Sequence, residues 1–170
     1  NRALADFIAL ARKNPDRYII GTNPAGSLPH IAAKLFVDLT QTGIAVVPYA
    51  SGGTNDAIRD IMGDRVHAVI DGWAGLRGAL EAGSIKALAI LSTKPTDLLP
   101  TLPTDLGTVP GFTALGWQAL TVRAGTPEAI VRKISGDLRK VLADPALQRR
   151  LLETGPEFQP LYDAELMRFI

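Results

Sequence analysis

The feature that most constrains the fold is an alternation of short, nearly continuous apolar runs with stretches of helical periodicity. The apolar runs cover residues 17–20, 44–49, 66–71 and 85–91. In the stretches between them, apolar residues recur every three or four positions, and Gly residues close each stretch. Continuous apolar strands separated by helices are typical of a parallel sheet covered by helices on both faces. The first part of the sequence therefore predicts an α/β fold.

The apolar periodicity also indicates the helices between these runs. It places Leu4, Phe7, Ile8 and Ala11 at helical spacing in the first helix and Ile31, Leu35 and Phe36 on one face of the second, and the third helix carries Ile58, Ile61 and Met62. The second helix is expected to begin at Pro29, because Pro is favoured in the first turn of a helix.

The pattern changes between Ser92 and Gly111, where four Pro residues stand among Thr, Leu and Asp without a clear period. This stretch is long for a loop within a compact domain, which indicates a crossing between two lobes. Beyond it the sequence predicts a strand at 117–122 that contains a core Trp117. Three helices follow, and their expected starts are Thr126-Pro127, Asp144-Pro145 and the region of Asp163.

Composition excludes several classes of function. The 170 residues include no Cys, which rules out a disulfide framework, a thiolate metal site and a cysteine nucleophile. The net charge of +1 and the scattered Lys and Arg residues argue against nucleic-acid binding. No apolar run is long enough to span a bilayer. His30 and His67 lie far apart in the sequence, so neither a zinc site nor another metal or cofactor is expected.

The candidate site lies where three predicted strands end. The segments Gly21–Ser27, Tyr49–Asn55 and Asp71–Gly72 each follow a strand and precede a helix. In a parallel sheet these turns lie together at the carboxyl edge, where helix N-termini present backbone N–H groups. The sequence therefore predicts a pocket for a carboxylate or phosphate. The alternative is that Gly and Ser occur here only because tight turns need them.

Other interpretations of the same residues have less support from the sequence. Neither Gly-rich segment has the Lys of a P-loop or the spacing of a dinucleotide-binding turn, which argues against a nucleotide. Ser27, His30 and Asp71 suggest a hydrolase triad, but no nucleophile-elbow pattern surrounds Ser27, and helix capping explains it. Asp71 has two interpretations that stay open: N-cap of the helix starting at Trp73, or ligand contact. Tyr49 and Trp73 are expected either to wall the pocket or to fill its rim.

In order along the chain, a set of motifs resembles the tripartite tricarboxylate transporter receptors, the Bug family. The set comprises Gly21…Gly26-Ser27…His30, Val47-Pro48-Tyr49, Asp71, Lys86-Ala87-Leu88-Ala89, Pro103-Thr104, Pro110-Gly111-Phe112, Trp117, Ala124-Gly125-Thr126-Pro127 and Ala143-Asp144-Pro145. The resemblance covers nearly the whole chain.

The resemblance implies part of a two-lobed periplasmic binding protein of type II topology, which is a receptor and not an enzyme. Residues 1–110 would form the second, ligand-binding lobe, and 111–170 would be the return strand and helices of the first lobe. The ligand would be a small carboxylate, whether a di- or tricarboxylate, an amino acid or an aromatic acid. The expected partners are the membrane permease subunits, and the expected location is the periplasm. Without the first lobe, we expect weak ligand binding and self-association through apolar residues 117–122.

The resemblance also places residues in the site. It maps the first loop onto Thr22, Gly26 and Ser27 and the second onto Gly52 and Gly53, while Ala50-Ser51 stand where the family commonly has Lys. Taken with the strand-end argument, the predicted ligand-binding set is Thr22, Asn23, Gly26, Ser27, Tyr49, Gly52, Gly53 and Asp71. The alternative from another class is a ligand-sensing domain of a regulatory protein.

Overall fold

The computed structural model describes residues 2–51, 53–92, 96, 99, 102, 104, 107–155 and 159–169. The chain divides into two units, residues 1–116 and 117–170, which are described separately. The first unit contains α1 (Arg2–Lys13), β1 (Ile19–Thr22), α2 (Leu28–Thr40), β2 (Ala45–Pro48), α3 (Gly53–Met62), β3 (Ala68–Val69) and α4 (Trp73–Glu81). The second contains α5 (Glu128–Leu142), α6 (Pro145–Thr154) and α7 (Asp163–Phe169).

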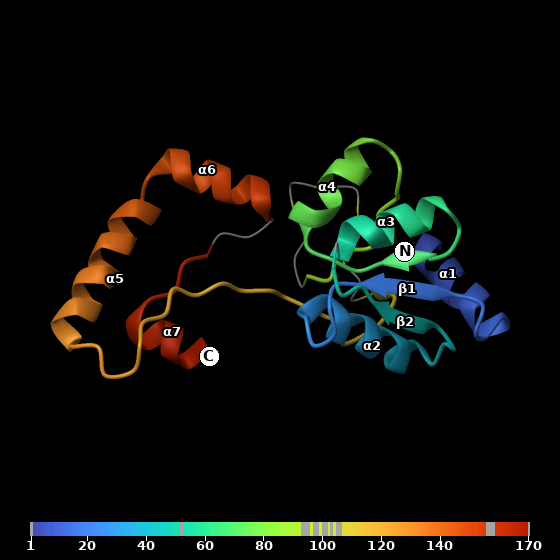
Figure 1. Cartoon of the computed structure of the whole chain (residues 1–170), viewed down its shortest axis with the longest axis horizontal. Coiled ribbons are helices and arrows are strands. Elements are labelled where there is room, and N and C mark those ends of the chain that lie inside the picture. Colours follow the sequence, from blue (N-terminus) through green and yellow to red (C-terminus); the bar gives the residue numbers. More distant parts are fainter. Residues whose placement is uncertain are drawn as a thin grey trace. The chain divides into compact units, whose positions relative to one another are not determined.

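The centre of the first unit is a three-stranded parallel sheet in the order β2-β1-β3 (Figure 1). Ile20 of β1 lies opposite Val46 of β2 and Ala68 of β3. Because the strands are parallel, the carboxyl ends of all three lie at the same edge, where each strand leads into a helix. The α/β class and the parallel sheet expected from the alternating pattern are therefore confirmed.

Helices cover both faces of this sheet. On one face, Ile20 packs in a core with residues of α1 and α2 and with Val109 and Phe112. On the other face, α3 approaches β1 so closely that a Cβ at Gly21 would lie 2.9 Å from Cβ of Ala57. Figure 1 shows α2 and α3 on opposite sides of the strands. This close packing needs Gly in β1 and Ala in α3.

The apolar face expected on α2 is only partly buried. Phe36 is buried, but Ile31 is 56% exposed and Leu35 is 37% exposed. The residues that face the sheet beside Phe36 are Ala32 and Ala33. Small side chains bring the helix axis close to the strands, and hydropathy periodicity alone overlooks them because Leu and Ile score higher.

The strand expected at 85–91 is not formed. Within the described residues, this segment makes only an isolated parallel bridge between Ile90 and Thr104. Leu88, Ala89 and Leu91 nevertheless pack against the core. The apolar residues of this run therefore contact the core without strand pairing.

In the second unit, the described part of the chain has helices at the expected places but no strand at 117–122. Trp117 is 58% exposed and contacts the ring of Phe169 edge-on, so its expected place in a core is wrong. Asp144 caps α6 by accepting a hydrogen bond from N of Ala146, as predicted. The N-cap of α5 is Pro127 and not the expected Thr126.

Candidate functional site

The loop after β1 turns the chain into α2. Thr22, the last residue of β1, is fully buried, and its hydroxyl donates to the carbonyl of Asn23. Gly26 has a φ of +85°, a left-handed conformation that favours Gly. Ser27 is the N-cap of α2 and accepts a 3.4 Å hydrogen bond from N of His30. The first turn of α2 therefore starts at the carboxyl edge of the sheet, with N of His30 bonded to the Ser27 hydroxyl and N of Ile31 bonded to the Ser27 carbonyl.

The loop after β2 leads into α3, and Gly52 in this loop lies outside the described residues. Tyr49 turns back beneath α3, where its hydroxyl donates a 2.6 Å hydrogen bond to Oδ2 of Asp60. Burial and this bond raise the pKa of Tyr49 to about 12. The same bond, with the guanidinium of Arg65, lowers the pKa of the Asp60 carboxyl. The Tyr49 hydroxyl therefore holds α3 against β2.

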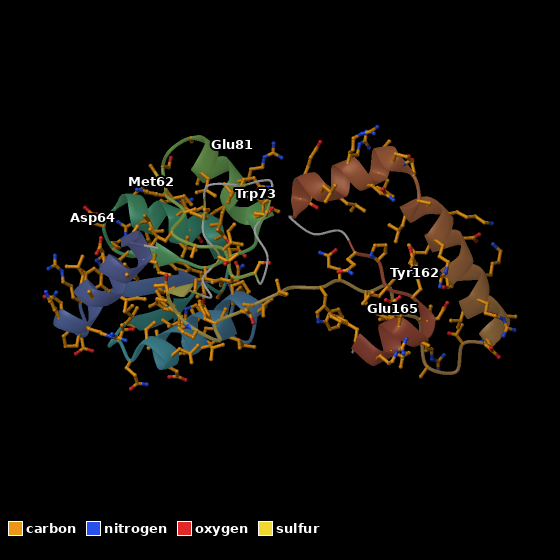
Figure 2. All side chains as sticks on the ribbon, turned by 180° about the vertical axis from the view of Figure 1, so that it is seen from behind. Met62, Asp64, Trp73, Glu81, Tyr162 and Glu165 are labelled. Carbon is orange, nitrogen blue, oxygen red and sulfur yellow. The ribbon has the colours of Figure 1, made fainter. Side chains whose placement is uncertain are left out.

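The end of β3 carries Asp71. The N-cap of α4 is Gly72, which has no side chain to bond the helix N-terminus. Asp71 instead accepts a 2.7 Å hydrogen bond at Oδ1 from N of Gly72. Of the two interpretations of Asp71, the N-cap role is therefore wrong. Trp73 begins α4 at this edge (Figure 2).

Side chains from all three strand ends meet at Asp71. Nδ2 of Asn23 donates to Oδ1 of Asp71 at 2.8 Å, and the Thr54 hydroxyl donates to Oδ2. The Thr54 hydroxyl also lies 3.2 Å from Oδ1 of Asn23. We call Asn23, Thr54 and Asp71 the edge cluster. It links the β1–α2 loop, the first turn of α3 and the end of β3.

Two glycines make room for the edge cluster. A Cβ at Gly53, which has a φ of +45°, would clash with Oδ1 of Asn23. A Cβ at Gly75 in α4 would clash with Oδ2 of Asp71. These close approaches, from two different helices, show that the turns are packed around the cluster.

Among the predicted site residues, the structure thus brings Asn23, Gly53 and Asp71 into contact. Thr54, the third member of the edge cluster, was missed by the sequence analysis. Its position in the first turn of a helix after a Gly pair is a usable signal, because a hydroxyl there faces the neighbouring loop.

The residues of the suggested hydrolase triad have other partners. Ser27 caps α2, Nδ1 of His30 accepts a 3.3 Å hydrogen bond from N of Gly26, and Asp71 belongs to the edge cluster. In the part of the chain that the structure describes, no hydrogen bond joins these three side chains to one another. The geometry does not assemble a nucleophile with its base.

The described residues contain no group of three His, Asp or Glu residues placed to hold a metal ion, and none of their helices has the length and hydropathy to span a membrane. A pocket of about 330 Å³ is lined by Ile8, Arg12, Leu39, Thr40 and Val109, among others. It lies on α1 and the end of α2, away from the strand carboxyl ends.

Comparison with known proteins gives a consistent result. The profile of a family described as "Tripartite tricarboxylate transporter family receptor" matches residues 1–170. A UPF0065 protein of Agrobacterium vitis is 30% identical over 155 residues, which make up 91% of this chain and 44% of that protein. The BugT protein of Bordetella pertussis is 29% identical, over 90% of this chain and 47% of its own length.

Solved structures show the same relationship. An R. palustris protein solved with adipate superposes with a TM-score of 0.86 and 31% identity, over 98% of this chain and 55% of its own. A protein described as a periplasmic transporter superposes with a TM-score of 0.76 and 28% identity, over 89% of this chain and 51% of its own. MatC from Rhodopseudomonas palustris, solved with bound malate, superposes with a TM-score of 0.74 and 25% identity, over 89% of this chain and 51% of its own. The chain spans about half the length of these relatives.

Proposed function

This chain belongs to the tripartite tricarboxylate transporter receptor family, and from that premise we propose that it binds a small carboxylate at the carboxyl edge of its sheet. The family is one of periplasmic solute-binding receptors and not of enzymes. Relatives of similar fold were solved with adipate and with malate, which supports a di- or tricarboxylate as the ligand.

The observation that carries the proposal is the convergence of three strand-end turns at the edge cluster. Because Asn23, Thr54 and Asp71 link the turns, the helices that start there are held in fixed positions relative to one another. Each helix start carries the positive end of a helix dipole, and first-turn N–H groups lack the usual intrahelical partner. At the start of α2, Pro29 has no N–H group and those of His30 and Ile31 are bonded to Ser27, so the first turns of α3 and α4 would supply most of the backbone donors. Converging N–H groups of this kind replace water around an anion, as at other helix N-termini that bind anions.

Lys and Arg are absent from the segments that form this edge. Residues 21–30, 49–58 and 71–76 contain no Lys or Arg. Binding would therefore depend on backbone donors, with hydroxyl groups adding to them. This favours a carboxylate, which needs few donors, over a densely charged phosphate ester.

Within the predicted binding set, we assign two kinds of role. Gly52 and Gly53 would offer main-chain N–H groups and Ser27 its hydroxyl directly to the ligand, whereas N of Gly26 would first have to give up its bond to Nδ1 of His30. The others, Thr22, Asn23, Tyr49 and Asp71, would hold the turns in place, since each has hydrogen-bond partners within the fold.

We further propose that residues 1–110 act as one lobe of a two-lobed receptor and that residues 111–170 belong with the other. The chain's coverage of about half of each relative supports this division. Closure of two lobes on the ligand would then present it to the permease subunits of the transporter. Residues 1–170 alone would bind weakly and self-associate.

Calorimetric titration with adipate, malate and succinate tests the binding site. We expect Gly53→Ala to weaken binding at least tenfold, because the added Cβ displaces Asn23 and separates the turns. Gly83→Ala is the matched control, since Gly83 also has a positive φ, +68°, but open space around its Cβ position. Equal binding by wild type and Gly53→Ala would contradict the proposed site, and no binding of any carboxylate by folded wild type would contradict the function.

A further inference from the structure

Asp71 is the acidic side chain of the β3 end, and both of its carboxylate oxygens are occupied. Oδ1 accepts hydrogen bonds from Nδ2 of Asn23 at 2.8 Å and from N of Gly72 at 2.7 Å. Oδ2 accepts the hydroxyl of Thr54, and α4 covers it further, because a Cβ at Gly75 would clash with this atom. A ligand ammonium group that approached Asp71 would compete with these three donors for the carboxylate oxygens.

The acidic side chains of α3 are occupied as well. Asp56 forms a 3.0 Å ion pair with Arg59. Asp60 accepts the hydroxyl of Tyr49 and two nitrogens of the Arg65 guanidinium. The carboxylates that the described residues place on α3 and at the end of β3 therefore all have partners within the fold.

Among the described residues, this edge therefore offers a ligand ammonium group no carboxylate without a partner in the fold. Helix starts carry N–H groups and positive dipole ends, which attract a carboxylate and repel a cation. A ligand ammonium group has three N–H donors and no acceptor, so it needs acceptors to replace its hydration. Losing water without such a partner is costly for a charged group.

We propose that this edge selects carboxylates that carry no ammonium group beside the bound carboxylate, so that dicarboxylates bind and amino acids are rejected. Asn23 and Thr54 act as positioning residues that keep Asp71 closed to the ligand. The inference rests on the proposed function, and it names the substrate class of the same site.

The test compares a symmetric ligand pair, adipate and 2,5-diaminoadipate, by calorimetry on the protein at the full length its gene encodes. The diamino compound has an ammonium group beside each carboxylate, so its orientation in the site does not matter. We expect wild type to bind adipate at least about tenfold more tightly, a difference of about 1.4 kcal/mol, because leaving a charged group unsatisfied is costly.

Thr54→Val removes the donor to Oδ2 of Asp71 at nearly constant shape, which leaves this oxygen available to a ligand ammonium group. We therefore expect the ratio of the affinity for adipate to the affinity for 2,5-diaminoadipate to fall severalfold. Thr54→Ser keeps the hydroxyl and should restore the wild-type ratio. The control is Thr42→Val: Thr42 is also buried and its hydroxyl contacts another hydroxyl, that of Thr40, but it precedes β2 at the opposite edge of the sheet.

The outcomes separate the two proposals. A wild-type ratio near one, with measurable binding of both ligands, overturns this inference and leaves the proposed function standing. A Thr54→Val ratio equal to that of wild type overturns the role of the edge cluster. If neither ligand binds folded wild type, the proposed function fails and this inference with it. If Thr54→Val does not fold, the ratio of the two affinities measured on wild type decides whether the inference stands.

Discussion

The hydroxyl of Tyr49 lies 2.6 Å from Oδ2 of Asp60, and this hydrogen bond joins the residue after β2 to the second half of α3. Tyr49 also lies against β1, since its Cε2 would be 3.1 Å from a Cβ at Gly21. One side chain thus contacts the central strand and fixes a helix whose N-terminus is part of the candidate site. Tyr49 connects the core of the sheet to the position of that N-terminus.

Replacing Tyr49 by Phe keeps the ring against β1 and removes only the hydrogen bond. We expect a lower urea midpoint of unfolding with little change in the slope, because Asp60 loses a donor and no cavity is created. Tyr162→Phe is the matched control: the Tyr162 ring lies under the Arg139 guanidinium, 4.0 Å from its centroid, and no hydrogen bond of its hydroxyl is found among the described residues. Equal losses in the two variants would contradict the role of the Tyr49 hydroxyl.

The pH dependence of stability should carry the signature of the same pair. The pKa of Tyr49 is raised to about 12, so its contribution to stability is present below about pH 10 and is lost as pH rises towards 12. The pKa of Asp60 is lowered, so its contribution is present above its ordinary value and is lost as pH falls through the lowered value.

Unfolding by urea between pH 3 and 11 measures this dependence. The difference in stability between wild type and Tyr49→Phe should be largest near neutral pH and shrink towards both ends of the range. A difference that stays constant over the whole range would show that the pKa shifts do not arise from this hydrogen bond.

Two glycines of α4 give a comparison within one helix. Gly78 has open space around its Cβ position, so Gly78→Ala should stabilise the protein by about 0.5–1 kcal/mol through helix propensity. Gly75 faces Asp71, so the same change there would push against the edge cluster. We expect Gly75→Ala to destabilise by about 1–3 kcal/mol, the usual range for overpacking.

Urea unfolding of both variants and titration with adipate measure this comparison. Gly75→Ala should also weaken carboxylate binding, while Gly78→Ala should leave it unchanged. Stabilisation by both substitutions would mean that Asp71 adjusts freely, which would argue against a fixed edge cluster.

Much of this architecture could be predicted from the sequence because it follows from periodicity. Apolar runs between helical stretches predicted the parallel sheet, and the strand ends located the turns that the structure brings together. Hydrogen bonds between side chains leave no such periodic pattern in the sequence. The bonds of Tyr49 to Asp60 and of Thr54 to Asp71 join positions 11 and 17 residues apart, and only the folded chain shows that they meet.

The errors have a common physical origin. Hydropathy placed Ile31, Leu35 and Phe36 on the apolar face of α2, whereas beside Phe36 the structure buries Ala32 and Ala33, because close packing against a sheet favours small side chains. The run 85–91 was predicted as a strand from its apolar content, but its apolar residues Leu88, Ala89 and Leu91 pack half-buried against the core without forming a strand ladder. In both cases the sequence pattern reported hydrophobicity and not geometry.

Ser27 allows the cap of α2 and the charge at the candidate site to be changed separately. Ser27→Ala removes the acceptor for N of His30, and we expect a loss of about 1 kcal/mol in stability, typical of N-cap removal. Ser27→Asp keeps an acceptor at the N-cap, so stability should stay close to that of wild type. Ser84→Ala, at an exposed position, is the control and should change stability by less than about 0.5 kcal/mol.

Ligand binding should order these variants differently. A carboxylate at position 27 would repel a ligand carboxylate held by the same helix start, so Ser27→Asp should bind adipate much more weakly although it is the more stable variant. Ser27→Ala removes at most one hydroxyl donor and should lose less affinity. Thermal unfolding gives the order of the variants by stability, and calorimetry on the same samples gives their order by affinity for adipate. If Ser27→Asp bound adipate as tightly as wild type, the anion would not lie at the start of α2, and the proposed site would have to move to another edge of the sheet.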